Sequence, residues 1–204
     1  MRRTEFLVDD PQEAEKFLNE CDYGVLSLIS EGEPYGVAVN FAYKEGKFYF
    51  HGAIDGRKAK AMREAVKCSF CVVKPYAFIP SYFSNTTSAC PATQCYASVI
   101  ASGTVMRVDT MEQKAAGLTA LMQKMQPEGG YEPIDAANPI YTKMLEKTGV
   151  YVIESDTITF KAKVAQHLTK ERYETLIEHM NERGSEVDHE TLALMKNFNK
   201  KEKE

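Results

Sequence analysis

Hydrophobic and polar positions alternate with a period of two along residues 24–53. Such alternation is typical of strands with one buried face. Glycine-containing turns at Glu31-Gly32 and Glu45-Gly46 interrupt it and leave only short connections,. The pattern therefore predicts an antiparallel meander with strands over 24–30, 35–43 and 47–53.

Strand composition returns in the second part of the chain. We expect strands over 67–74 and 96–108, and a final hairpin of 150–153 and 157–160 that turns at Ser155-Asp156,. Gly103 interrupts the long strand and indicates a bulge or a close backbone approach. The aromatic and proline-bearing stretch 75–95 has no clear period and is predicted to be a loop or lid.

Helical spacing marks the remaining segments. Asp10 and Pro11 are typical of a helix start, and Thr110 with Gln113 has the spacing of a capping box,. The predicted helices span 11–22, 57–65 and 110–125, one follows Pro139, and two lie beyond Thr169, separated at Gly184.

The order of these elements limits the fold class. Tight turns among the first three strands exclude a doubly wound parallel sheet, because each parallel pair needs a crossover. We expect a mainly β (α+β) fold: a six-stranded antiparallel barrel with peripheral helices. The domain division predicted is a barrel over 1–168 and a C-terminal helical extension over 169–204.

Composition narrows the class of protein further. The 204 residues are 44% hydrophobic and carry a formal charge of −4, which fits one generous globular domain and argues against a non-specific nucleic-acid binder. No apolar run approaches a membrane span or signal-peptide core, so a soluble, cytoplasmic protein without membrane partners is expected. Five cysteines form an odd set, and reduced thiols are expected,.

A candidate anion site follows the third strand. That strand ends in small residues, and Gly56 then leads into Arg57 and Lys58 at the start of a helix. Backbone N–H groups, the helix dipole and two cationic side chains at one point are typical of a phosphate site. The alternative is a solvated basic surface.

Five segments together resemble one known family. They are Tyr23–Ser27, Pro34–Asn40, Tyr49–Ala53, Gly56–Lys58 and Tyr96–Gly103. This combination is similar to the pyridoxamine 5′-phosphate oxidase-like FMN-binding split barrels, specifically the nitroimidazole-resistance branch, over about residues 23–165. The vitamin B6 oxidases carry a further Arg/Lys set for substrate phosphate that has no convincing equivalent here, so vitamin B6 oxidation is not favoured.

The resemblance implies a homodimeric split barrel with FMN at the subunit interface, its phosphate held by Arg57 and Lys58. It also implies that His51 faces the active site and delivers a proton; the alternative is a packed, hydrogen-bonded histidine. The other implied cofactor-binding residues are Val37, Ala38, Val39 and Asn40, then His51, Gly52 and Ala53, and finally Ser98 and Val99.

The function expected from the resemblance is an FMN-dependent oxidoreductase that reduces a small organic acceptor such as a nitroimidazole or nitroaromatic. Two alternatives remain: a flavin- or haem-binding module without turnover, and a barrel that binds a partner protein through its C-terminal helices. Cys68 and Cys71 are read as structural thiols, whereas Cys90 and Cys95 could pair or hold a metal. The remaining histidines, His167, His179 and His189, are read as surface residues, and the aromatic residues of 75–95 as a cover or a lid.

Overall fold

The computed structural model describes residues 3–84 and 87–198. The chain folds into two compact units. We call residues 11–72 and 99–158 the barrel unit, and residues 1–10, 73–98 and 159–204 the C-terminal unit. Three long strands contribute residues to both units. Whether 1–168 and 169–204 are separate domains stays a prediction.

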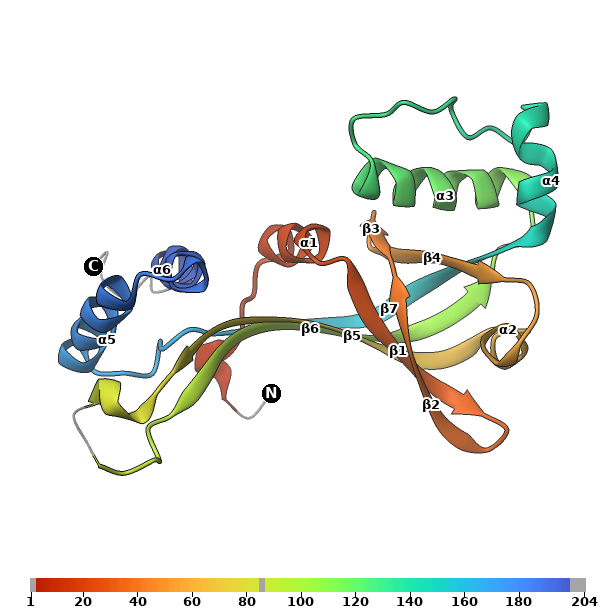
Figure 1. Cartoon of the computed structure of the whole chain (residues 1–204). Coiled ribbons are helices and arrows are strands. Elements are labelled where there is room, and N and C mark those ends of the chain that lie inside the picture. Colours follow the sequence, from red (N-terminus) through yellow and green to blue (C-terminus); the bar gives the residue numbers. More distant parts are fainter. Residues whose placement is uncertain (1–2, 85–86, 199–204) are drawn as a thin grey trace. The chain divides into compact units, whose positions relative to one another are not determined.

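Seven strands form one sheet, of order β2-β1-β5-β6-β7-β4-β3 (Figure 1). The strands are β1 Tyr23–Ser30, β2 Glu33–Asn40, β3 Ala42–Lys44, β4 Lys47–Ala53, β5 Val66–Ile79, β6 Thr93–Arg107 and β7 Thr148–Lys163. The helices of the described residues are η1 Thr4–Phe6, α1 Pro11–Glu20, α2 Arg57–Ala61, η2 Ser81–Ser84, α3 Met111–Met125, α4 Pro139–Lys147, α5 Lys170–Arg183 and α6 Glu186–Phe198.

The predicted three-stranded meander does not form as one unit, and its segments make two separate hairpins, β1 with β2 and β3 with β4. β1 pairs with β2 over its whole length, from Tyr23 opposite Asn40 to Ser30 opposite Glu33. Exposed and buried residues alternate without a break along β1. The intervening turn has positive φ at both Glu31 and Gly32, as a two-residue hairpin turn requires,.

The strand expected over 35–43 is broken at Phe41, and this expectation was wrong. Phe41 is fully buried, and its ring centroid lies 5.2 Å from that of Phe70 and 5.8 Å from that of Phe48. Packing of this ring turns the chain between β2 and β3, which stand at opposite ends of the strand order. Because one residue joins the two edge strands, the sheet must curl round on itself. The curled sheet has seven strands where six were expected, and the mainly antiparallel barrel class is confirmed.

A half-buried lysine holds this corner. The ammonium of Lys124 on α3 donates to the carbonyl oxygens of Leu18, Cys21 and Phe41, and it lies 3.9 Å from the centroid of the Phe41 ring. Burial lowers the pKa of Lys124. One side chain thereby connects the end of α1, the β2–β3 corner and α3.

The hairpin expected at residues 155–156 does not form, and β7 runs through them without a turn. Gly103 on β6 explains why: a Cβ there would stand 2.0 Å from the Glu154 carbonyl oxygen, so the two backbones approach closely. Lys67 also forms an ion pair of 2.8 Å with Asp156. The close approach expected at Gly103 is confirmed, and it holds the polar Ser155-Asp156 pair in an extended strand.

The predicted loop over 75–95 is much shorter in the structure. β5 continues to Ile79 and β6 begins at Thr93, so both strands extend into the expected loop, with η2 between them. Of its aromatic residues, Tyr76 and Phe83 are buried, whereas Phe78 and Tyr82 are exposed. The helix expected over 57–65 also ends early, at Ala61.

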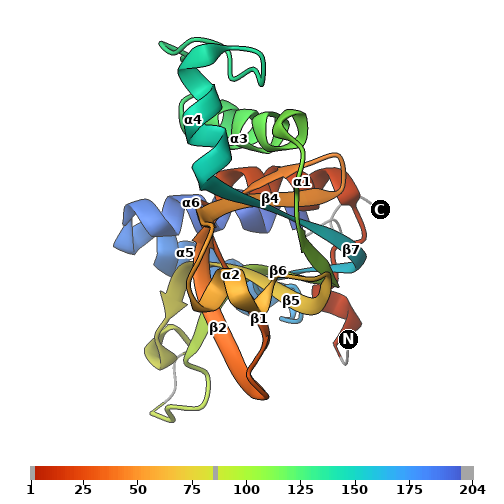
Figure 2. The same ribbon diagram turned by 90° about the vertical axis from the view of Figure 1, so that its right-hand side faces the viewer.

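Helices α3 and α4 cover one side of the barrel unit (Figures 1 and 2). The capping bond from the Gln113 N–H to the Thr110 hydroxyl is present at 3.2 Å. The apolar core shared by these helices and the strands they cover is made by Ala42, Val108, Ala115, Leu118, Ala120, Leu121, Leu145, Val150 and Val152.

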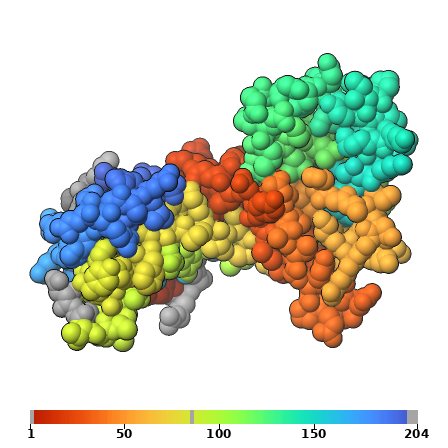
Figure 3. Space-filling model, viewed as in Figure 1, coloured from red at the N-terminus to blue at the C-terminus, as the bar shows by residue number. Residues whose placement is uncertain are grey.

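Helices α5 and α6 belong to the C-terminal unit, where their blue surface lies against the yellow end of β5 and η2 (Figure 3). The Ala77 N–H donates to the buried hydroxyl of Thr191 at 2.9 Å, and Arg183 donates to the Phe78 carbonyl at 3.0 Å. Arg183 also holds the pKa of the fully buried Asp188 at about 2. Hydrogen bonds thus fix the tail to the strand it covers.

Among the described helices, none combines the length and the apolar character needed to cross a lipid bilayer.

Replacement of Lys124 by Met keeps the apolar stem but leaves three carbonyl oxygens without their donor. We expect a loss of about 2–4 kcal/mol in the free energy of unfolding, measured by urea denaturation. Lys143→Met, at an exposed position on α4, should change it by less than about 0.5 kcal/mol,. Equal stability of the two variants would show that the corner does not depend on Lys124.

Candidate active site

The predicted phosphate-binding cations lie together after the end of β4. Gly56 has a φ of 105°, a conformation that favours glycine, and α2 begins at the next residue,. The Nε of Arg57 donates to the Ser30 hydroxyl at 3.3 Å, and its guanidinium lies 4.4 Å from the centroid of the Tyr35 ring. Arg57 is therefore held at the ends of β1 and β2.

Lys58 extends toward β4 instead. Its ammonium lies 3.4 Å from the His51 carbonyl oxygen and 5.7 Å from the Phe50 ring centroid. A Cβ at Gly52 would stand 2.6 Å from that ammonium, so the glycine leaves room for it. Burial lowers the pKa of Lys58, because the charged form loses water and gains only one long contact with a carbonyl,.

Neither cation is neutralised within the described part of the chain. Arg57 and Lys58 form no ion pair with a described carboxylate, and the terminal nitrogens of Arg57 make no hydrogen bond there. Two cations placed by one short helix, one of them partly desolvated, favour an anion beside them.

The predicted β2 residues divide between the two faces of the sheet. Val37 pairs with Leu26 and Val39 with Gly24, on the side that β1 buries. Ala38 and Asn40 point to the exposed side. The Asn40 amide donates to the Asp22 carbonyl at 2.9 Å and contacts the Met125 sulfur at 3.6 Å, so it has a structural role at the start of β1.

The predicted β4 residues also alternate. His51 pairs with Val150 and shares its strand face with Ala53, whereas Gly52 lies toward Lys58. Desolvation, followed by the positive charge of Lys58, lowers the pKa of His51. The imidazole is consequently neutral over more of the physiological pH range than an ordinary histidine.

Ser98 and Val99 are adjacent buried residues of β6, and Val99 is fully buried. Ser98 belongs to the C-terminal unit and Val99 to the barrel unit. The predicted residues that the structure does bring into contact are therefore His51, Gly52 and Lys58, and Arg57 precedes Lys58 on α2.

Ser30 and Tyr35 were not predicted as site residues, yet both contact Arg57. A signal for Ser30 was present in the sequence. The alternation of β1 places it on the buried side with Leu26 and Leu28, and a hydroxyl at an inward position needs a partner,.

The cysteines are all free thiols. Burial raises the pKa of Cys68 and of Cys95 to about 11, which keeps both protonated and weakly reactive,. Among the described residues, no group of three or more metal-ligating side chains converges.

Comparison with known proteins places this chain in a family. A family model described as pyridoxamine 5′-phosphate oxidase matches residues 10–162. No curated protein matches the chain.

Three solved structures illustrate the shared fold. A candidate 5-nitroimidazole antibiotic resistance protein from Bacteroides thetaiotaomicron is 20% identical over 76% of this chain and 86% of its own, with a TM-score of 0.61. The flavocytochrome Anf3 from Azotobacter vinelandii is 19% identical over 78% of this chain and 69% of its own, with a TM-score of 0.65. A FAD and haem binding protein from Mycobacterium smegmatis is 17% identical over 76% of this chain and 72% of its own, with a TM-score of 0.65.

The family prediction made from the strand motifs is confirmed, and the structural neighbours include a candidate member of the branch that was named. The chain belongs to the pyridoxamine 5′-phosphate oxidase family.

Proposed function

We propose that this protein is an FMN-dependent oxidoreductase that reduces a small organic acceptor such as a nitroimidazole or nitroaromatic. The observation that carries the proposal is the un-neutralised pair Arg57 and Lys58 in a chain of this family. Names of the structural neighbours support it, since they include a flavocytochrome, a FAD and haem binding protein and a candidate nitroimidazole-resistance protein.

The donors of the site fit a phosphate. The Arg57 guanidinium is oriented by Ser30 and Tyr35 while its terminal nitrogens remain available, and the Lys58 ammonium has one long carbonyl contact. A dianionic phosphate would supply the missing acceptors and offset the desolvation of Lys58. When bound, FMN supplies the electron carrier, and the protein supplies position and charge.

Replacement of Arg57 by Gln should weaken FMN binding roughly tenfold to hundredfold, because a charge-assisted contact to phosphate is lost. Riboflavin, which lacks the phosphate, should bind both forms of the protein equally. Titration calorimetry with FMN, FAD and riboflavin measures the three affinities and identifies the preferred flavin.

Arg63→Gln is the matched control, since Arg63 is an exposed arginine just beyond α2. It should leave all three affinities unchanged. If Arg57→Gln binds FMN as tightly as the unmodified protein does, the phosphate is not at this pair.

His51 is the proposed proton donor for the acceptor. Only its protonated ring can donate, and desolvation and Lys58 disfavour that form in the free protein. A phosphate beside Lys58 would offset the charge of that lysine and raise the pKa of His51. Proton delivery is thus linked to occupation of the anion site.

His51→Gln should retain FMN and reduce turnover by about 10²- to 10⁴-fold, as expected for loss of a general acid. Wild-type turnover should fall as the pH rises through the pKa of His51, and the variant should lack this dependence. The measurement is anaerobic stopped flow, in which the dithionite-reduced protein is mixed with a 5-nitroimidazole and the oxidised flavin absorbance is followed. Wild-type turnover in the variant would remove His51 from the mechanism.

A second candidate is a flavin- or haem-binding module without turnover, favoured by the lowered pKa of His51, which disfavours the proton-donating form, and by the names of two neighbours. The same experiment separates the two functions. Reduced wild-type protein that nitro compounds fail to reoxidise supports the module.

We further propose that the protein is a homodimer with the cofactor at the subunit interface. β1 exposes apolar side chains along one face of the barrel unit, and Val25 lies between Ala38 on β2 and Cys71 on β5. Exposed apolar side chains on one face of a strand favour association. The large exposed members of this face on β1 are Tyr23, Val25 and Ile29.

Val25→Lys places a charge within this face and should convert the dimer into a monomer, with loss of FMN if the cofactor lies at the interface. Light scattering after size exclusion measures the mass. Val187→Lys, at an exposed apolar position on α6, is the control and should remain dimeric. A Val25→Lys dimer with full flavin content would refute this interface.

A further inference from the structure

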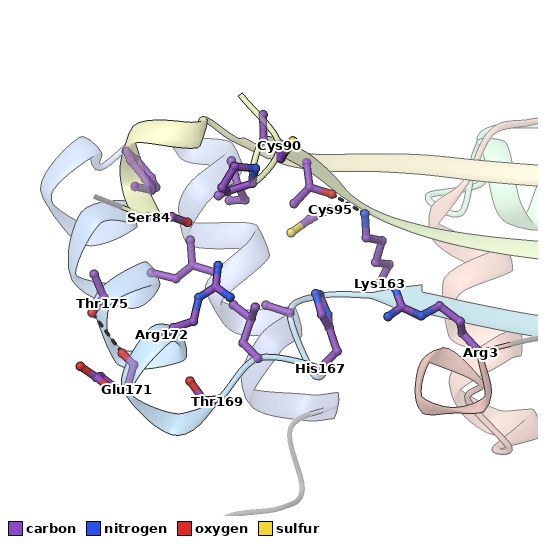
Figure 4. Close-up of a pocket in the computed structure, with 18 residues that line it drawn as sticks. Arg3, Ser84, Cys90, Cys95, Lys163, His167, Thr169, Glu171, Arg172 and Thr175 are labelled. Atoms are coloured by element: carbon purple, nitrogen blue, oxygen red, sulfur yellow. Dashed lines mark hydrogen bonds between the residues drawn. The ribbon is translucent and has the colours of Figure 1, made fainter. Parts of the chain in front are cut away.

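The C-terminal unit contains a cavity of about 610 Å³ that is separate from the Arg57 and Lys58 pair (Figure 4). Its size is within the range of small-molecule pockets. Buried apolar side chains line part of it, among them Ile79, Phe83 and Leu176. The cavity can therefore accommodate the apolar body of an organic molecule.

Cationic side chains from separate segments line the same cavity. Arg3 comes from the N-terminal segment, Lys163 from the end of β7, and Arg172 from the first turn of α5. His167 lies between β7 and α5. In Figure 4 these four side chains face a common space, and the carboxylate of Glu171 points away from them.

The positive charge of this group is only partly neutralised. Arg3 forms an ion pair with Glu5 at 3.0 Å, and Lys163 donates to the Thr93 hydroxyl. Arg172 makes no ion pair or hydrogen bond with the described residues. An uncompensated guanidinium in the wall of a cavity favours an anionic ligand.

The pKa of His167 is consistent with three cations lying close together around the cavity. Desolvation lowers the pKa of His167, and so do the charges of Arg3, Lys163 and Arg172, against an opposing effect of Glu5. Three cations are thus close enough to act on one imidazole. An anion in the cavity would relieve their mutual repulsion.

The start of α5 adds to this field. Thr169, its N-cap residue, lines the cavity and makes no side-chain capping bond. The helix continues for 14 residues, so its positive dipole end lies at the cavity wall,. Cations, helix end and apolar wall are arranged around the same space.

We propose that this cavity is a second ligand site, which binds an amphipathic organic anion. A carboxylate or phosphate contacts Arg172, Lys163 and Arg3, and the apolar body of the molecule lies against Ile79, Phe83 and Leu176. The ligand is distinct from the flavin proposed for the barrel unit.

The test uses three naphthalene probes that differ only in the polar group: 2-naphthoate, 2-naphthyl phosphate and uncharged 2-naphthol. Each is titrated calorimetrically into the full chain in saturating FMN, so that any flavin site is filled. We expect both anions to bind at least about tenfold more tightly than 2-naphthol, from charge-assisted contacts. The tighter anion identifies the head group as carboxylate or phosphate.

Arg172→Gln should weaken both anions about tenfold and leave 2-naphthol unchanged. Lys170→Gln is the matched control, because Lys170 lies in the same first turn of α5 but does not line the cavity. Lys163→Met provides an independent loss of charge on β7. The proposal is overturned if 2-naphthol binds as tightly as the anions, or if Arg172→Gln and Lys163→Met both bind them normally. Arg57→Gln, which tests the flavin site, should leave naphthoate binding intact.

Discussion

The corner at Phe41 is the constraint from which the candidate site follows. One buried residue joins the strands at opposite ends of the strand order, and Lys124 satisfies its carbonyl together with two carbonyls of the α1 end. A sheet bent in this way brings the segment after β4 to the ends of β1 and β2. Arg57 can then contact Ser30 and Tyr35, which are distant from it in sequence.

Lys124 and Lys58, both in the barrel unit, show how the surroundings of a lysine decide whether its charge serves the fold or a ligand site. Lys124 is surrounded by three carbonyl acceptors, so its charge is used within the fold. Lys58 is also desolvated but has a single long carbonyl contact. Burial lowers the pKa of both, yet only Lys58 lies beside a second cation with unused donors. The anion site is therefore indicated by cationic donors that lack hydrogen-bond acceptors, and not by positive charge alone.

Local signals predicted much of the fold, and long-range contacts decided the rest. The alternation of polar and apolar residues predicted β1 and β2, and the spacing of Thr110 and Gln113 predicted the N-terminal cap of α3. The break at Phe41 was not, because it depends on rings that pack from other strands.

At both candidate sites, too, local sequence signals predicted some residues and long-range contacts determined the others. At the candidate active site, the glycine and the two cations were predictable, whereas Tyr35 required the barrel register. The surface position expected for His167 is confirmed, but the cations around it were not foreseen. Chain folding alone brings Arg3 near Arg172, so no local pattern could have shown the cavity.

Identification of the small molecule that the protein carries tests directly whether Arg57 and Lys58 hold a flavin phosphate. Purified protein is denatured, and the released material is analysed by mass spectrometry and by absorbance. We expect FMN, near one per chain, and the same product after apoprotein is reloaded from a mixture of riboflavin, FMN and FAD. Colourless protein that releases no flavin, and takes up none from that mixture, would contradict it.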